Sequence, residues 1–110
     1  MSPIQLVEFL DGQGRSPFSR WLDGVGPEAA ARITAVLYRL AEGNFSNVKG
    51  VGSGVLERVI DYGPGYRVYF GKDGERIVIL LGGSAKNRQQ AAIDAAHERW
   101  SEYRKRKKAG

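Results

Sequence analysis

The chain has 110 residues and a mass of 12.1 kDa, with 42% hydrophobic and 26% charged residues, which suits one domain with a modest core. It has no cysteine and one histidine, which excludes disulfides, thiolate catalysis and a multi-histidine metal site. No apolar run approaches the ~20 residues of a membrane span, and no signal peptide follows Met1. We therefore expect one cytoplasmic domain over residues 1–110, without cofactor or membrane partner.

The positive charge lies mainly at the C-terminus. The formal net charge is +5, and residues 98–110 alone hold six basic and two acidic side chains, which gives +4. A basic run of this kind is typical of a polyanion-binding arm. It is equally typical of a solvated helix end whose cations suit the helix dipole.

The first part of the chain predicts a strand and two helices. Residues 4–10 alternate in part between apolar and polar side chains, as in a half-buried strand. Ser16 suits an N-cap and the proline after it suits the first helical position, which predicts a short helix over 17–23. Residues 27–43 carry apolar side chains at helical spacing and end in a glycine, which predicts a second helix.

Three strands are predicted next, after a loop over 44–54. They cover 55–62, 66–71 and 77–81. A Gly-Pro-Gly turn joins the first two, and Asp73-Gly74 is a strong two-residue hairpin signal between the second and the third. The third strand is apolar on both faces, as a central buried strand would be, and Gly82-Gly83-Ser84 is expected to end it.

A final helix completes the domain. The segment Asn87–Gln90 resembles a capping box, and the helix is expected to run to about Lys107. Ile93, Trp100 and Tyr103 fall on its apolar stripe. The order β-α-α-β-β-β-α predicts an α+β fold: a single small domain with a curved, mostly antiparallel sheet packed by a helical hairpin and a C-terminal helix.

The strand around the Gly-Pro-Gly turn carries the candidate chemistry. Arg67 and Tyr69 point to one face because side chains alternate along a strand. If residue 60 pairs with 67, Arg58 lies opposite Tyr69 on that face, whereas a shift by one residue moves Arg58 to the other face. The Asp73-Gly74 turn would pair 69 with 78 and 67 with 80. A guanidinium in such a position matches phosphate oxygens, or it pairs structurally with Asp61 or Glu57.

Lys86 lies at the start of the final helix, where backbone N–H groups and the helix dipole attract anions. Tyr69 could stack on a base or hydrogen-bond a sugar hydroxyl. Two arginines, a lysine and a tyrosine without metal or thiol suit phosphodiester recognition and cleavage by electrostatic stabilisation. His97 lies one position off the apolar stripe and is expected to be structural or solvent-facing. The two tryptophans are expected to be core anchors.

Four segments together resemble a known family. They are Leu56-Glu57-Arg58, Gly63-Pro64-Gly65-Tyr66-Arg67-Val68-Tyr69-Phe70, Ile77 to Gly83, and Lys86 to Gln90 with Asp94, Ala95 and Ala96. The chain resembles, from residue 4 to about 100, the addiction-module killer proteins, which are HigB-like toxins of the RelE/ParE superfamily in type II toxin–antitoxin systems. The most specific part is the Gly-Pro-Gly-Tyr-Arg-Val-Tyr-Phe run followed by Lys-x-x-Gln.

The resemblance implies a RelE-like fold and a toxin that inhibits translation by cutting mRNA on the ribosome, as a metal-independent endoribonuclease. It implies a cognate helix-turn-helix antitoxin, and contact with operator DNA only through the toxin–antitoxin complex. The residues that fall on the motif positions are Arg58, Tyr66, Arg67 and Lys86. With Tyr69 from the strand argument, the expected catalytic residues are Arg67, Arg58, Lys86 and Tyr69. The residues that we expect to bind RNA are Lys49, Tyr66, Arg88, Arg104, Lys105 and Arg106.

The resemblance leaves the acid–base chemistry open. In the implied reaction Arg67 contacts the scissile phosphate, the 2′-hydroxyl attacks, and the leaving 5′-oxygen needs an acid. The final helix offers Asp94, His97 and Tyr103, none of which clearly matches the family pattern. Two other functions therefore stay open: a ParE-like toxin that inhibits DNA gyrase without cutting RNA, and an inactive remnant that only binds its antitoxin.

Overall fold

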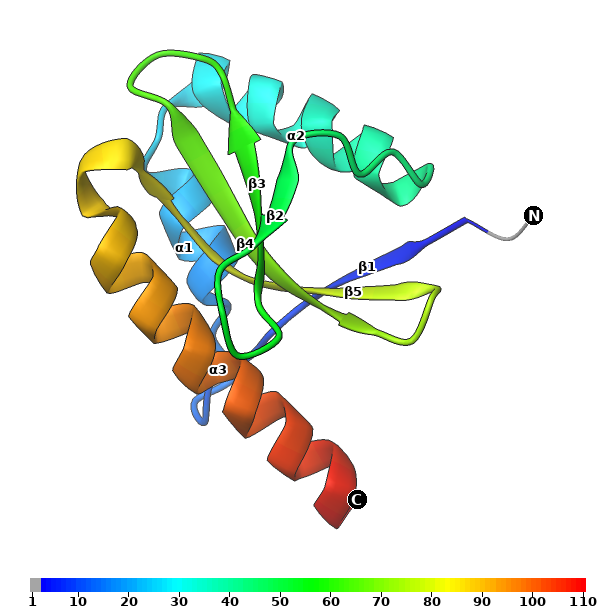
Figure 1. Cartoon of the computed structure of the whole chain (residues 1–110). Coiled ribbons are helices and arrows are strands. Elements are labelled where there is room, and N and C mark those ends of the chain that lie inside the picture. The colour runs from blue at the N-terminus through cyan, green and yellow to red at the C-terminus, as the bar shows by residue number, and fades with distance from the viewer. Residues whose placement is uncertain (1–2) are drawn as a thin grey trace.

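The computed structural model describes residues 3–110, which form one five-stranded sheet with helices on both faces (Figure 1). The strand order is β1-β5-β4-β3-β2. The first strand runs parallel to β5, and the other neighbours are antiparallel. The elements in chain order are β1 (Gln5–Glu8), α1 (Pro17–Asp23), α2 (Pro27–Ala41), β2 (Val48–Gly50), β3 (Leu56–Ile60), β4 (Tyr66–Asp73), β5 (Ile77–Ala85), the 3-10 turn η1 (Lys86–Arg88) and α3 (Gln89–Ala109).

The helices α1 and α2 cover one face of the sheet. Ser16 caps α1, since its Oγ accepts a hydrogen bond of 3.0 Å from the Ser19 N–H, and a proline occupies the first turn as expected. The apolar stripe of α2 packs, together with α1, on side chains of β3, β4 and β5. The buried members of this core are Phe18, Ile33, Val36, Leu37, Leu40, Ile60, Val68, Phe70, Val78 and Leu80.

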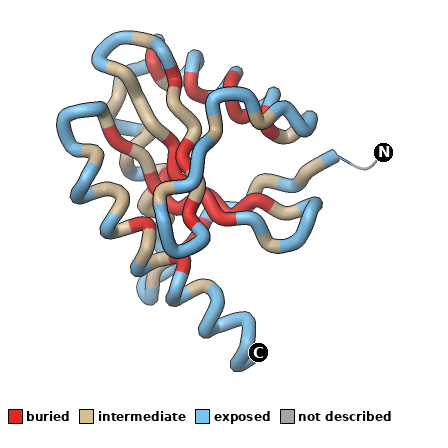
Figure 2. Tube along the Cα trace, viewed as in Figure 1, coloured by how far each residue is buried: buried red, intermediate tan, exposed pale blue. Residues whose placement is uncertain are grey.

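The helix α3 covers the other face, where a second core forms. Its buried members are Phe9, Val55, Tyr69, Ile79, Leu81, Ala96 and Trp100. Figure 2 shows the central strands buried and the C-terminal turns of α3 exposed. Trp100 is a core anchor, as expected, and is only 7% exposed. The α+β class, the two-helix hairpin and the C-terminal helix are therefore confirmed.

The structure differs from the predicted elements at several places, and the strands β1, β3 and β4 differ from the predicted ranges by one to two residues at their ends. The expected loop over 44–54 contains the strand β2, which pairs with β3 through Val48 and Arg58. The strand β5 continues through the Gly-Gly-Ser segment to Ala85, because this segment pairs with residues 66–69 of β4. The Trp21 ring lies directly over Gly83, where a side chain would block the contact. The capping box is wrong: η1 precedes α3, and Arg88 occupies the N-cap without a side-chain hydrogen bond.

The pairing of the strands also differs from the prediction. Ile60 pairs with Tyr66, so Arg58 lies opposite Val68 and not opposite Tyr69. The loop between β4 and β5 has three residues, since Asp73 pairs with Ile77. A β-bulge after Tyr69 then shifts the register further. Five residues separate the paired ends of β3 and β4, which moves every side chain of β3 to the face opposite from the one expected.

The part of the chain that the structure describes, 3–110, contains no helix that is long and apolar enough to cross a membrane. Within the same residues no group of three or more histidine, cysteine, aspartate or glutamate side chains could hold a metal ion.

Gly71 is predicted to be essential for packing α3 on the sheet. A Cβ there would lie 2.5 Å from two ring carbons of Trp100, so Gly71→Ala must displace the indole and should lower the free energy of unfolding by about 1–3 kcal/mol. Gly50→Ala is the matched control, because a Cβ at Gly50 meets nothing within 4 Å. Urea unfolding of both variants measures the difference, and equal stabilities would contradict the packing account.

Candidate functional site

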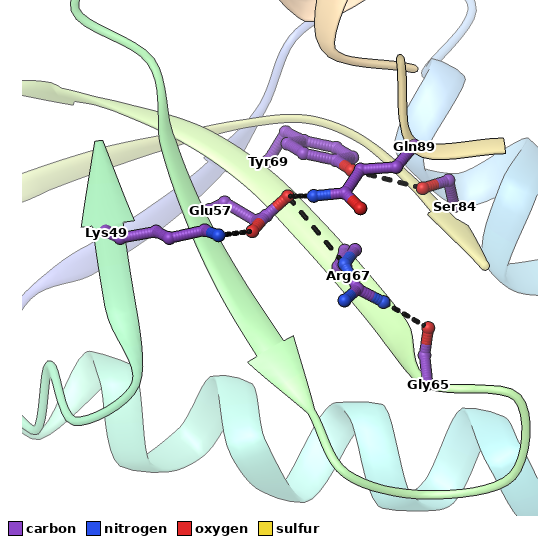
Figure 3. Close-up of polar contacts among 7 residues, drawn as sticks. All are labelled: Lys49, Glu57, Gly65, Arg67, Tyr69, Ser84 and Gln89. Atoms are coloured by element: carbon purple, nitrogen blue, oxygen red, sulfur yellow. Dashed lines mark hydrogen bonds and ion pairs between the residues drawn. The ribbon is translucent and has the colours of Figure 1, made fainter. Parts of the chain in front are cut away.

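A buried carboxylate links three elements at one end of the sheet. Glu57 on β3 is fully buried, and its Oε2 accepts a 2.9 Å hydrogen bond from the Gln89 side chain at the start of α3. The Oε2 atom also lies 3.9 Å from Arg67 Nε on β4, and Oε1 lies 3.6 Å from Lys49 Nζ on β2. Figure 3 shows these side chains converging on Glu57 from both neighbouring strands and the helix. We call Lys49, Glu57, Arg67 and Gln89 the Glu57 cluster.

Arg67 is held in place at two points. Besides Glu57, its Nη1 donates a 2.8 Å hydrogen bond to the carbonyl of Gly65. Gly65 has φ +80, a conformation that favours glycine, and a Cβ there would come within 3.3 Å of Arg67 Nη1. The same Cβ would lie 3.9 Å from Lys86 Cβ, so the turn packs close to the start of η1. The turn therefore orients Arg67, whose side chain remains 11% exposed.

The hydrogen bonding of the cluster is incomplete. Glu57 Oε1 and Arg67 Nε are buried and have no hydrogen-bond partner. The Arg67 contact is thus an ion pair at the outer limit of distance, not the bidentate pair that an arginine and a carboxylate can form. Glu57 therefore attracts the guanidinium but accepts no hydrogen bond from it. The unpartnered Nε is buried, so an anion from solvent could reach only the exposed 11% of the side chain.

The cluster has an excess of positive charge toward solvent. Lys49 and Arg67 outnumber the single carboxylate, which gives +1. Lys86 is exposed in η1 and follows the end of β5. The Lys49 side chain is 63% exposed, whereas Glu57 is at the bottom of the arrangement. Cations oriented over a buried carboxylate in this way can bind phosphate oxygens. Lys49 and Arg67 are therefore predicted site residues that the fold brings together, whereas Lys86 lies in η1 next to the Gly65 turn.

Arg58 does not belong to this site. The observed register places it opposite Val68, on the sheet face that α1 and α2 cover. Its guanidinium donates to the neighbouring Val59 carbonyl, and burial, with Arg39 nearby, lowers its pKa. The prediction that Arg58 shares a face with Arg67 and Tyr69 is wrong, because it assumed a turn with one residue more between the paired positions.

Tyr69 is on the expected face but inside the core. Its ring is fully buried, and its hydroxyl lies 3.1 Å from Ser84 Oγ. Burial raises the pKa of Tyr69 to about 12. The side chain is part of the core under α3, and because it is buried it cannot stack on a base. The pairings of 69 with 78 and of 67 with 80 are also wrong, since Tyr69 faces Gly82 and Arg67 faces Ser84.

The residues expected to bind RNA are spread over the molecule. Tyr66 packs edge-to-face on Trp21, with ring centroids 6.0 Å apart, on the side of α1. Arg88 is exposed at the end of η1. Arg104 and Lys105 are exposed near the end of α3. Arg106 pairs with Glu102, donates to the Leu10 carbonyl and lies over the Phe9 ring, so it holds the helix to the body.

The three acid–base candidates of α3 are engaged elsewhere. Asp94 accepts a 3.0 Å hydrogen bond from Gln90, and His97 Nε2 lies 2.9 Å from the Val51 carbonyl, which fixes the loop before β3. The Tyr103 hydroxyl donates a hydrogen bond to Asp73. Burial is the larger cause and the Asp73 carboxylate the smaller cause that raise the pKa of Tyr103 to about 12. The expectation that His97 is structural is confirmed.

Sequence reasoning identified only part of this network. The pairing of Arg67 with Glu57 is confirmed, but the role of Gln89 as the donor that reaches Glu57 was hidden by its assignment to a capping box. Gln89 is the last residue of the Lys-x-x-Gln segment and the first residue of α3, and its side chain reaches Glu57.

The fold and the cluster define the class: an α+β domain with an oriented arginine and a lysine over a buried glutamate. No family model matches the chain. It is 41% identical over 80 residues to a protein of Haemophilus influenzae (strain ATCC 51907 / DSM 11121 / KW20 / Rd) described as an uncharacterized protein, and the match covers 72% of this chain and 81% of the relative. The chain belongs to the same family as that protein.

Loss of the buried carboxylate should destabilise the fold. Glu57→Ala leaves Arg67 partly buried without its partner, which should cost about 3 kcal/mol of unfolding free energy. Glu102→Ala removes the exposed pair with Arg106 and is the matched control, expected to cost less than about 0.5 kcal/mol. Urea unfolding at neutral pH compares the two; similar losses would show that Glu57 does not organise the cluster.

The burial of Tyr69 should appear in the alkaline stability of the protein. Its pKa rises from 10.0 to about 12 on folding, so its contribution is complete below pH 10 and is lost as the pH rises toward 12. The expected slope is roughly 1.4 kcal/mol per pH unit in this window. Tyr103, whose pKa is also raised to about 12, adds a slope in the same window. Tyr69→Phe should therefore lower the total slope by roughly 1.4 kcal/mol per pH unit, whereas Tyr38→Phe, which changes a 71% exposed residue, should leave it unchanged. Urea unfolding at several alkaline pH values measures both, and an unchanged slope in Tyr69→Phe contradicts the assignment.

Proposed function

We propose that this protein is the toxin of a type II toxin–antitoxin system, a HigB-like member of the RelE/ParE superfamily that acts in the cytoplasm as a ribosome-dependent mRNA endoribonuclease. One observation carries the proposal. The two segments with the most specific resemblance, residues 63–70 and 86–90, meet in space at the Glu57 cluster, where Arg67 and Gln89 both contact the same carboxylate. Residues that a family resemblance singles out independently thus form one oriented cationic site.

The geometry suits a phosphodiester bond approaching Arg67 from solvent. The guanidinium would contact the non-bridging oxygens of the scissile phosphate, where negative charge increases as the 2′-oxygen attacks. Lys49 and Lys86 would neutralise the adjacent phosphates. The 2′-oxygen bonds to phosphorus as it loses its proton, the bond to the 5′-oxygen breaks, and that oxygen takes up a proton. Glu57 is fully buried, so it acts through Arg67 as a positioning residue.

The contacts of Arg67 with Glu57 and with the Gly65 carbonyl favour a second candidate function. A guanidinium that is 11% exposed and already paired also suits a cluster that only stabilises the fold. On that ground a ParE-like toxin that inhibits DNA gyrase without cutting RNA is the alternative, and an inactive antitoxin-binding remnant is the other. All three share the cognate helix-turn-helix antitoxin as the proposed partner, with operator DNA contacted through the complex.

Translation of one defined mRNA in vitro, with new 5′ ends mapped by primer extension, tests the proposed activity. We expect cuts within the coding region that require ribosomes, and Arg67→Ala should reduce them by at least about 100-fold. Arg58→Ala is the matched control, since it removes the same charge from the opposite face of the same hairpin and should retain most of the activity.

Three results would contradict the assignment. Intact mRNA together with inhibited DNA supercoiling would indicate the gyrase inhibitor, and intact mRNA without growth inhibition would indicate the remnant. Cleavage that survives Arg67→Ala but is lost in Arg58→Ala would place the chemistry on the other face of the sheet. Circular dichroism of each variant confirms that it is folded before activity is compared.

A further inference from the structure

A second cationic surface lies away from the Glu57 cluster. A groove of about 730 Å³ runs between the C-terminal half of α3, the end of β4 and the loop around Ser53. Figure 1 shows this half of α3, in orange to red, extending past the sheet. The groove is lined by five basic side chains, namely Lys72, Arg104, Lys105, Lys107 and Lys108, together with His97, Trp100, Tyr103 and Asp73. We call it the α3 groove.

The α3 groove has one carboxylate among its lining residues, and that carboxylate is neutralised. Asp73 accepts a hydrogen bond of 2.5 Å from the Tyr103 hydroxyl and pairs with Lys107. These two contacts, with Lys107 the larger cause, lower the pKa of Asp73, so it stays ionised and holds Lys107. Arg104, Lys105 and Lys108 are exposed and remain as cationic excess facing the groove.

The lining favours a polyanion over a protein segment. The apolar part of the lining comes mainly from the rings of Trp100, which is buried, and Tyr103, which is half-buried. The exposed large apolar side chains of residues 3–110, Val7, Leu10 and Tyr38, do not line the groove. A docked peptide would need apolar surface to bury at the centre of its interface. Flexible lysines on an exposed helix face suit phosphates, which they bind as point charges with release of counterions.

The position of the groove indicates an extended ligand. Arg67 and Asp73 lie six residues apart on β4, which corresponds to ~20 Å along the strand. A ligand that contacted both the Glu57 cluster and the α3 groove would be a polymer with repeated negative charges. We propose that the α3 groove binds the phosphate backbone of an RNA strand, as a contact separate from the site at Arg67. The choice of RNA among polyanions rests on the proposed function.

The structure revises which residues of the basic tail take part. Arg106 faces away from the groove, where it contacts Leu10 and Phe9, although it was grouped with Arg104 and Lys105 by sequence. Lys108 takes its place, while Lys107 lines the groove but pairs with Asp73. Lys72 lines the groove from β4, but its ammonium lies 4.9 Å from the centre of the Phe45 ring, which packs on the core beneath α1 and α2. The variant Asp73→Asn should strengthen RNA binding, because it removes the negative charge from the groove and makes the groove more positive.

Fluorescence polarisation with a labelled single-stranded RNA of about 20 nucleotides, without ribosomes, tests the groove. In the double variant Lys105→Ala/Lys108→Ala, the slope of the logarithm of the binding constant against the logarithm of the salt concentration should become less steep by about 1.4. Binding near 0.1 M salt should weaken about 25-fold. Asp73→Asn should tighten binding about 5-fold. Arg20→Ala/Arg39→Ala removes two exposed charges from the helices of the opposite face and should change binding less than about 2-fold.

The outcomes separate this inference from the proposed function. Equal weakening in the groove and control variants, or weaker binding in Asp73→Asn with its fold intact, would falsify the groove assignment whether or not mRNA is cleaved. Polyglutamate that competes as well as RNA of equal charge would overturn the choice of RNA. If the groove variants behave as expected and mRNA stays intact on ribosomes, the groove stands as an RNA site and the nuclease proposal fails.

Discussion

The structure around the candidate site depends on one buried carboxylate. Glu57 has no exposure to solvent, so the cost of desolvating its charge is recovered only if cations and donors surround it. Three elements provide them, from β2, β4 and the start of α3. The requirement ties the end of the sheet to the helix, and it orients Arg67 toward the surface as a consequence.

The second constraint is the packing of a tryptophan ring on a glycine of the sheet, and it occurs on both faces of the sheet. The Trp100 ring sits over Gly71 on the side of α3, and the Trp21 ring sits over Gly83 on the side of α1. Each indole needs a strand position without a side chain to reach the backbone. The glycines that read as strand ends or turns in the sequence are therefore the places where the helices approach the sheet most closely.

Two cationic regions result from this arrangement, and they differ in how their charges are held. Arg67 is fixed by Glu57 and Gly65, which favours a contact of defined geometry. The lysines at the end of α3 are exposed on flexible stems, which favours attraction without a defined geometry. A long nucleic acid suits the combination, with one point of precise contact and one of general affinity.

The sequence by itself determined the class of fold, the two helices with their proline starts and the three central strands. These follow from local periodicity and turn chemistry, which nearby residues decide. Only the tertiary structure decided the face on which Arg58 lies, the extent of β5 and the union of Glu57 with Gln89. Strand register depends on one residue in a turn or a bulge, and a contact across 32 positions depends on how α3 docks. Neither is encoded in a local pattern, because packing of the whole core selects among registers that each segment alone permits.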